Sequence, residues 1–310
     1  MLARLQQATT LALLAVASLW AWWFAQQGRP LLAAVGAAGV VFSYAAVLAL
    51  EMTLMARVNR NDAAPRAALP QIVRGWWSEV TTAPRVFCWR QPFRSKLVGD
   101  QLSGTTRGVV LVHGFVCNRG LWNPWLTRLR EFGTPVVAVN LEPVFGSIDA
   151  YPATIEAAVG QIERATRQAP VIVAHSMGGL AVRAWLDRYE ALGRVHRVIT
   201  IGTPHHGTWL ACLSQTPNGC QMRLGSAWLA SLAARESDAL RRCFTCFYGH
   251  CDNIVFPASS ATLAGADNRH LEAIAHVAMT YHPDVFRELM RWLDGTDAPV
   301  PARTHDSPEG

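Results

Sequence analysis

Two long uncharged stretches at the amino terminus constrain the fold more than any other feature of the sequence. No charged residue lies between Arg4 and Arg29, and a second uncharged run extends from Arg29 to Glu51. Each run approaches the ~20 apolar residues with which a helix crosses the hydrocarbon core of a bilayer. Since a segment in lipid must make its backbone hydrogen bonds internally, both runs are expected to be helical. The short turn around Arg29 therefore predicts a transmembrane helical hairpin over residues 1–58.

A cleaved signal peptide is the alternative interpretation of the first run, because Arg4 supplies a basic start. No small-x-small cleavage site follows cleanly after the tryptophans at its end, which are Trp20, Trp22 and Trp23. Tryptophans in such a position are typical of the interface between lipid and water. The sequence thus favours an uncleaved anchor.

The arginines around the hairpin predict its orientation. Arg4, Arg57, Arg60 and Arg66 lie where the two ends of the hairpin meet, and only Arg29 lies at the turn. Positive charge accumulates on the cytoplasmic side of membrane proteins, so both termini and the remaining domain are expected in the cytoplasm. This orientation would reverse if the second run, which is rich in Ala and Gly, failed to span.

Residues 59–102 form an arm that prolines interrupt and that mixes aromatic residues with arginines. Two interpretations of this arm remain open: contact with the membrane surface and ordinary packing on the surface of the domain. The formal charge of +6 is spread along the chain without a run of like charges, which excludes an obvious nucleic-acid-binding surface.

Buried strands alternate with helices in the remainder of the chain. Strands are expected at residues 109–112, 135–140, 171–174, 198–201 and 270–274, and helices at 121–132, 151–168 and 177–189. Strands that are apolar throughout and alternate with helices indicate a parallel sheet covered on both faces. Residues 103–295 therefore predict one α/β domain, and residues 296–310 a disordered tail.

Ser176 stands directly between a buried strand and a helix, in the pentapeptide Ala174-His175-Ser176-Met177-Gly178. This is the G-x-S-x-G nucleophile elbow with alanine in the first place, where small residues allow a cramped turn that exposes the hydroxyl. Serine near glycine is common in ordinary turns, but the flanking strand and helix predict that Ser176 is a nucleophile. His175 beside it is interpreted as a packing residue.

Acyl transfer also needs two backbone amides aimed at the oxygen that becomes negative. The turn His113-Gly114-Phe115 follows the first strand of the domain. The amides of Phe115 and Met177 are therefore the predicted oxyanion hole, and the His113 side chain is expected to brace the loop.

A serine attacks well only when a histidine takes its proton, and a carboxylate must orient that histidine. In this architecture the chain order is serine, acid, histidine. Asp252 follows a strand-like run and opens a loop that ends at Pro257, so Asp252 is the predicted acid. The alternative, Asp267, lies in a GADN sequence that is typical of turns.

Three histidines compete for the position of the base. His276 follows the last expected strand and precedes a short apolar stretch, which places it in a loop above the sheet. His270 would begin that strand at its opposite end, and His282 begins a helix next to Pro283. The sequence favours His276.

Taken together, these motifs resemble those of a known family. The runs HGF, AHSMGG, IGTPHHGT, DNIVFPASSATLAGADN and IAHVAMTYHPDVF follow one another between Gly108 and Leu293. In this combination the chain resembles the bacterial triacylglycerol-lipase-like esterase branch of the α/β-hydrolase superfamily. The resemblance implies Ser176, Asp252 and His276 as the catalytic triad, with the amides named above as oxyanion donors.

The resemblance also implies a loop near the site at Gly202–Gly207 and small lid-like helices between Thr208 and Arg241. Two features depart from the family pattern. Ala174 replaces the first glycine of the elbow, and a membrane hairpin replaces the usual secretion signal. The second departure argues against a secreted, fat-digesting enzyme and favours one held in the bacterial inner membrane, with its catalytic domain on the cytoplasmic side.

We therefore expect a membrane-anchored serine hydrolase that cleaves lipid-like or hydrophobic carboxylic esters through an acyl-enzyme, without a metal or organic cofactor. Cys243 and Cys246 form a C-x-x-C pair, but no second pair stands at zinc spacing. With the domain in the periplasm, Cys212 and Cys220 could instead close a disulfide loop. An acyltransferase with the same triad and a non-catalytic membrane scaffold remain alternatives, and the oligomeric state is left open.

Overall fold

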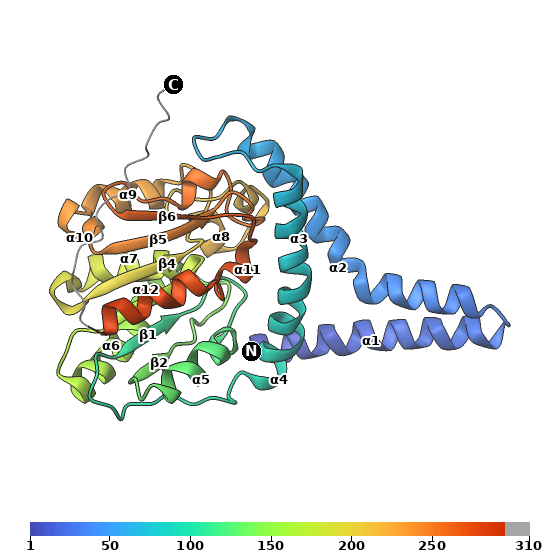
Figure 1. Ribbon diagram of the computed structural model, residues 1–310, viewed down its shortest axis with the longest axis horizontal. Coiled ribbons are helices and arrows are strands. Elements are labelled where there is room, and N and C mark those ends of the chain that lie inside the picture. The colour runs from blue at the N-terminus through green and yellow to red at the C-terminus, as the bar shows by residue number, and fades with distance from the viewer. Residues whose placement is uncertain (295–310) are drawn as a thin grey trace, which may run out of the picture.

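The computed structural model describes residues 1–294, so the tail predicted at 296–310 lies outside the described residues. The two apolar runs form α1 (Leu2–Gln26) and α2 (Pro30–Val58), an antiparallel pair that extends away from the rest of the chain (Figure 1). Both helices are long and apolar enough, by length and composition, to cross a membrane. Gly28 at the turn has a φ of +67°, which glycine adopts without strain. The predicted hairpin is confirmed as a pair of apolar helices.

The base of the hairpin packs into the α/β domain. Met52 and Met55 of α2 share a buried cluster with Cys251, Phe256 and Ala275, which belong to the loops at the end of the sheet. The cluster is closed by partly buried side chains from α2, the arm and the loop after β4: Leu54, Val58, Ala67, Ile72, Trp76, Trp209 and Leu210. The base of the hairpin therefore shares a small buried cluster with the loops of the domain.

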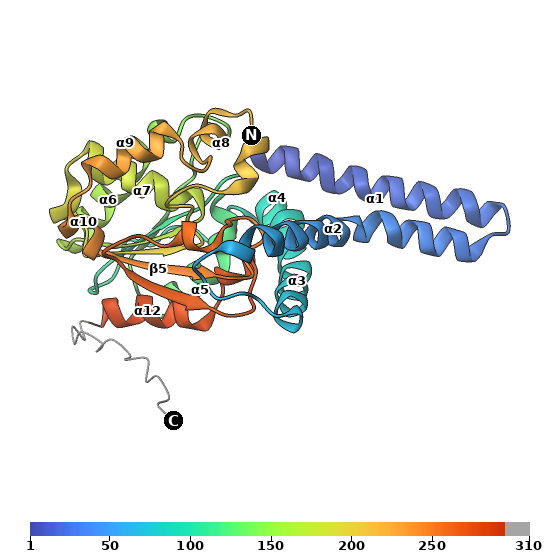
Figure 2. The same ribbon diagram turned by 90° about the horizontal axis from the view of Figure 1, so that it is seen from above.

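The arm between the hairpin and the domain is helical. It consists of α3 (Leu69–Pro84), the π-helical turn η2 (Arg85–Arg90) and α4 (Gln91–Arg94). Two hydrogen bonds join α3 to α2, one from Trp76 Nε1 to the Ala45 carbonyl (2.9 Å) and one from Tyr44 Oη to the Val80 carbonyl (3.0 Å). In Figures 1 and 2, α3 runs across the direction of the hairpin.

Six parallel strands form the central sheet, in the order β2-β1-β3-β4-β5-β6. Their bounds are β1 Val109–Val112, β2 Val136–Ala138, β3 Val171–His175, β4 Arg197–Ile201, β5 Phe244–Gly249 and β6 Asp267–Leu271. Because every strand is parallel to its neighbours, the carboxyl ends meet at one edge of the sheet, where α/β proteins bind their ligands.

Helices cover both faces of the sheet, as predicted. Val110 and Val112 point into a core that contains residues of α6 (Pro152–Thr166) and α7 (Met177–Arg188). On the opposite face, Val109 and Leu111 point into a core shared with α5 (Asn123–Glu131) and α12 (Pro283–Leu293). This alternation within β1 is the two-residue period of a strand that is buried on both faces.

The last strand differs from the prediction of residues 270–274. β6 begins at Asp267 and ends at Leu271, so Asp267 is the first residue of the strand rather than a turn residue. The preceding turn is closed by Asn268, whose Oδ1 accepts a hydrogen bond from the Leu263 amide (2.8 Å). Ala273 has a φ of +52°, which interrupts the extended backbone and ends the pairing before Ile274.

The segment from Thr208 to Arg241 forms short helices, as the family resemblance implies. They are α8 (Pro217–Gln221), α9 (Ala227–Arg235) and α10 (Asp238–Arg242). Leu229 of α9 and Leu240 of α10 are buried in the same core as α6 and α7. These helices therefore pack on one side of the domain.

Candidate active site

Ser176 lies in a strained turn between β3 and α7. Its φ of +55° and ψ of −132° are unusual for a residue other than glycine. The Ser176 amide donates to the Ile201 carbonyl (2.8 Å), and the Thr203 hydroxyl donates to the Ser176 carbonyl (2.9 Å). The neighbouring β4 and the loop after it thus hold the turn that the elbow motif predicts.

Glycines allow this turn to fit against the loop after β1. A Cβ atom at Gly114 would lie 2.6 Å from the Ser176 Cβ, and one at Gly178 would lie 2.5 Å from the His113 carbonyl oxygen. Neither distance is compatible with a side chain. The close approach of the two loops brings Phe115 beside Ser176, and both line the same cavity.

His276 and Asp252 form a buried pair at the same edge of the sheet. Nδ1 of His276 lies 2.9 Å from Oδ2 of Asp252, and both side chains are almost fully shielded from solvent. The other carboxylate oxygen of Asp252 accepts the amides of Ile254 (2.9 Å) and Val255 (2.8 Å). Asp252 is therefore fixed by its own loop and holds the imidazole through Nδ1, which leaves Nε2 for a second partner.

Ser176 and His276 line one cavity, together with His175. Within the described residues no hydrogen bond joins the Ser176 hydroxyl to His276, and such catalytic contacts often tighten only when substrate binds. The structure thus gathers the serine, the acid and the base that the sequence predicts at one edge of the sheet.

The pKa of His276 is raised above its ordinary value. Burial by itself favours the neutral imidazole, but the Asp252 carboxylate beside Nδ1 outweighs it, with help from Glu79 and Glu51. A base of this kind accepts a proton more readily than a free histidine does.

The competing candidates lie elsewhere. His270 is the penultimate residue of β6, with its ring beside those of Tyr248 (5.2 Å between centroids) and His250 (4.6 Å). His282 precedes α12, where its side chain accepts the Asp284 amide (3.3 Å). Neither side chain lines the cavity that contains Ser176.

The two histidines that were expected to be structural brace the site. Nε2 of His113 accepts the Leu141 amide (3.0 Å), so Nδ1 carries the proton and donates to the Gly114 carbonyl (2.9 Å). Burial lowers the pKa of His113 to about 4, which keeps it neutral. His175 Nε2 lies 3.3 Å from the His276 carbonyl oxygen, so His175 supports the backbone of the base.

The predicted oxyanion donors flank Ser176. Met177 is the first residue of α7, where a backbone amide has no partner within its own helix. Phe115 follows Gly114 in the loop that approaches Ser176 most closely. The helix dipole of α7 adds a partial positive charge at the same point.

Sequence reasoning missed two carboxylates that hold the backbone around His276. Glu79 of α3 is buried, and its two oxygens accept the amides of Val277 and Ala278 (3.1 Å each). Glu51 of α2 accepts a hydrogen bond from Asn253 Nδ2 (2.6 Å). Its partner Asn253 in turn accepts the His276 amide through Oδ1 (3.2 Å).

Only one signal in the sequence points toward these carboxylates. Glu51 is the residue that ends the second uncharged run, and a carboxylate within a long apolar helix is costly unless it is paired. Glu79 stands in the polar and aromatic sequence WWSEV, which gives no indication of burial.

The cavity above Ser176 has a volume of about 690 Å³ and an almost wholly apolar lining. Its walls come from α1, α2, α3 and η2, and from the loops that carry Phe115, Ser176, Asn253 and His276. Among the described residues that line it, none belongs to the segment between Thr208 and Arg241. The hairpin and the arm, rather than the short helices of that segment, therefore enclose the site.

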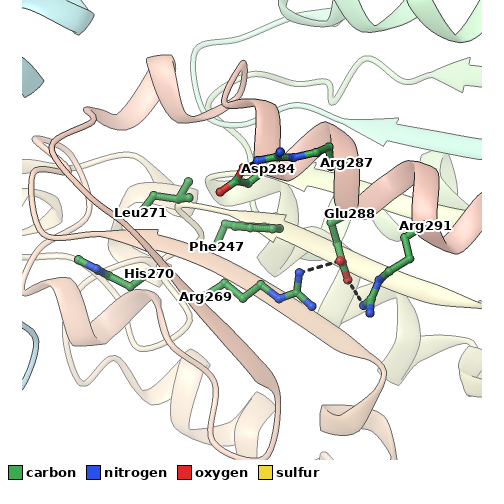
Figure 3. A pocket seen from close by; sticks show the side chains of 8 residues that line it. All are labelled: Phe247, Arg269, His270, Leu271, Asp284, Arg287, Glu288 and Arg291. Atoms are coloured by element: carbon green, nitrogen blue, oxygen red, sulfur yellow. Dashed lines mark hydrogen bonds and ion pairs between the residues drawn. The ribbon is translucent and has the colours of Figure 1, made fainter. Parts of the chain in front are cut away.

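A second hollow, of about 260 Å³, lies between β6 and α12 and away from the triad (Figure 3). Arg269 and Arg291 both pair with Glu288, at 2.7 and 2.8 Å, and Arg287 pairs with Asp284. The arginines and carboxylates that line this hollow are thus engaged with one another, as expected of a structural ion-pair network.

The cysteines show no metal or disulfide arrangement within residues 1–294. All seven are free thiols, and no group of three or more His, Cys, Asp or Glu residues is placed to hold a metal ion. Cys246 is buried with its sulfur 3.5 Å from Nε2 of His205, and burial raises the pKa of Cys243 and Cys246 to about 12. Both thiols are therefore protonated at neutral pH.

Comparisons with known proteins agree with this fold. The mature form of the Bacillus licheniformis lipase BlEst2 superposes with a TM-score of 0.53 and 19% identity, covering 61% of this chain and 92% of that one. Aspergillus fumigatus lipase B gives a TM-score of 0.53 and 23% identity, with 59% of this chain and about half (51%) of that longer one covered. Identities this low show the fold alone.

No curated protein sequence matches the chain. The model of the alpha/beta hydrolase family matches residues 109–307, which is well over half of the sequence. The chain belongs to the α/β-hydrolase family.

Proposed function

We propose that the protein is a serine hydrolase that cleaves carboxylic esters. We also propose that the hairpin anchors the protein in a membrane. One observation carries the proposal: Ser176 in a strained elbow lines the same apolar cavity as His276, whose Nδ1 lies 2.9 Å from the Asp252 carboxylate. The lipases among the similar folds are consistent with it.

The reaction begins when the Ser176 hydroxyl attacks the ester carbonyl and its proton passes to Nε2 of His276. Asp252 stabilises the imidazolium through Nδ1, while the amides of Phe115 and Met177 stabilise the oxyanion. His276 then returns the proton to the departing alcohol, which leaves the acyl group on Ser176. A water molecule, deprotonated by the same histidine, releases the carboxylic acid.

The membrane location rests on the hairpin. Both helices meet the length and composition of membrane spans. Arg4, Arg57, Arg60 and Arg66 belong to the end of the hairpin nearest the domain, and Arg29 belongs to the tip. We propose on this basis a bacterial inner-membrane enzyme whose catalytic domain faces the cytoplasm.

Hydrolysis of p-nitrophenyl esters by the detergent-solubilised full chain tests the proposed chemistry. We expect turnover in the wild type and a loss of about 10⁴-fold or more in kcat for Ser176→Ala and for His276→Ala. His270→Ala, which changes a histidine outside the cavity, is the matched control and should retain activity. Equal activity in the wild type and Ser176→Ala would overturn the proposal, as would the absence of any turnover.

A further inference from the structure

Two walls of the active-site cavity are formed by the hairpin itself. α1 contributes Leu13 and Leu14, and α2 contributes a stripe that runs from Val41 through Val47 to Glu51. Within this stretch the lining residues Val41, Tyr44, Leu48 and Glu51 follow one another at intervals of three or four residues, which places them on one face of α2. The helices that fit a bilayer therefore also line the approach to Ser176.

The cavity is buried at one end and exposed where the hairpin lines it. At its inner end, Ser176 and His276 are buried, whereas farther out Leu14 and Val47 are 49% and 56% exposed. From Glu51 to Val41 the cavity follows α2 for about 15 Å, because a helix rises ~1.5 Å per residue. Apolar side chains that line an open channel are unfavourable in water and favourable against hydrocarbon.

The arm shows where the membrane surface meets the molecule. Val73 and Trp77 of α3, Trp89 of η2 and Phe93 of α4 all have exposed apolar side chains. Since α3 runs across the direction of the hairpin in both views, a hairpin that stands along the membrane normal puts α3 in the plane of the membrane surface (Figures 1 and 2). Tryptophan is enriched at that depth. The ester groups of glycerolipids lie at the same level.

The chemistry of the lining identifies the occupant. About 690 Å³ lies within the range of ~300–1,000 Å³ that is usual for ligand sites. The described lining contains no lysine or arginine, so it offers no cationic side chain of these types to a phosphate or carboxylate headgroup. The carboxylates Glu51 and Glu79 lie at the inner end, near His276, rather than along the channel. An uncharged acyl chain matches this distribution.

We propose that the hairpin is the acyl-binding wall of the active site. The substrate is a long-chain glycerolipid ester that enters from the bilayer, with its acyl chain between α1 and α2 and its ester carbonyl at Ser176. This inference rests on the proposed ester hydrolysis and adds to it the substrate class and the route of entry.

The inference is tested by tryptophan substitutions that narrow the cavity where the hairpin lines it and leave Ser176, His276 and Asp252 unchanged. Val47→Trp fills the cavity from α2, and Leu50→Trp is its matched control, because Leu50 lies one turn away, is 59% exposed and does not line the cavity. On α1, Leu14→Trp and Leu11→Trp form a second matched pair, in case one substitution in α2 prevents folding. The readout is kcat/KM for p-nitrophenyl acetate in detergent and for dioleoylglycerol in phosphatidylcholine vesicles.

We expect the ratio of long-chain to acetyl kcat/KM to fall about tenfold or more in Val47→Trp and Leu14→Trp, and to change by less than about twofold in the two controls. The inference would be overturned, and the proposed ester hydrolysis would stand, if the ratio were unchanged in Val47→Trp and Leu14→Trp while acetate hydrolysis still depended on Ser176. An equal fall in the channel variants and their controls would overturn it too. A wild type that hydrolyses neither substrate would instead overturn the proposed function on which the inference rests.

Discussion

At the residue scale, the site depends on a backbone conformation that is costly by itself. A non-glycine residue with the φ of Ser176 costs about 1 to 3 kcal/mol, and such strain persists only where the surroundings enforce it. Here the surroundings that enforce it are the hydrogen bonds to Ile201 and Thr203. Gly114 also packs directly against Ser176, which is possible because Gly114 has no side chain. The strain exposes the hydroxyl to the cavity, where a nucleophile is needed.

Glu79 leads to a prediction about pH and stability. Burial raises the pKa of Glu79 to about 7, although His276 and the amides of Val277 and Ala278 favour its charged form. The folded protein therefore holds this proton more tightly than the unfolded chain, so the stability that the group contributes is present below about pH 4.5 and is lost as the pH rises through 7. Glu79→Gln cannot lose a proton.

Between pH 5 and pH 8 we expect the wild type to lose up to about 3 kcal/mol more unfolding free energy than Glu79→Gln does. Thermal unfolding in detergent at both pH values measures this shift. The exposed carboxylate Glu272 supplies the control variant Glu272→Gln. A difference between Glu79→Gln and wild type that is independent of pH would contradict the buried titration of Glu79.

The contrast between Ser176 and Glu79 explains what the sequence can reveal. The strained turn at Ser176 was predictable because the elbow is a local pattern, with strand, serine, glycine and helix within a few residues. Asp252 and His276 were chosen from the chain order of the architecture together with their positions after expected strands. Glu79 acts across a separation of about 200 residues in the chain, and no local pattern marks a contact of that kind.

At the scale of elements, the strands were predictable because continuous apolar runs are their own signature. The position of β6 was not, since Asn268 and Ala273 set its ends through a side-chain hydrogen bond and a positive φ. The short helices after β4 were also expected from the resemblance. Their distance from the cavity follows from packing on α7, which a single sequence does not show.

A buried ion pair joins α7 to the loop between α9 and α10. Arg183 donates to both oxygens of Glu236 (2.6 and 2.9 Å) and to the His205 carbonyl (2.9 Å), and both charged side chains are fully enclosed. Removal of one partner leaves the other charge buried without compensation. Arg183 therefore holds both the loop between α9 and α10 and the loop that follows β4 against α7.

We expect Glu236→Ala to lower the unfolding free energy by about 3–5 kcal/mol. The neighbouring Arg235 forms an exposed pair with Asp187, so Arg235→Ala is the matched control and should cost less than about 1 kcal/mol. Chemical unfolding followed by circular dichroism measures both. Similar losses in the two variants would contradict a structural function of the buried pair.

At the scale of the whole molecule, the base of the hairpin packs against the loops beside the candidate active site. Met52 and Met55 complete a buried cluster that includes Cys251, the neighbour of Asp252. Asn59 donates a hydrogen bond to the His250 carbonyl (3.3 Å) and accepts one from the Ala258 amide (3.1 Å). Glu51 adds its hydrogen bond to Asn253. A simple tether would make none of these contacts.

Two truncations of the hairpin distinguish a function as an anchor from a contribution to the stability of the domain. Removal of residues 1–58 exposes the buried cluster, so we expect a clear fall in Tm and loss of ester hydrolysis. Replacement of residues 21–35 by a short Gly-Ser turn removes only the tip, which lies beyond the cavity lining, and should leave the Tm of the domain nearly unchanged. Full activity and Tm after removal of residues 1–58 would show that the hairpin is a separable anchor.

The most direct test of Ser176 as the nucleophile is covalent labelling with a fluorophosphonate probe, followed by mass spectrometry of the labelled peptide. We expect one adduct, on Ser176, which disappears in Ser176→Ala and forms far more slowly in His276→Ala. An adduct on another serine, or labelling that persists in Ser176→Ala, would contradict nucleophilic catalysis by Ser176.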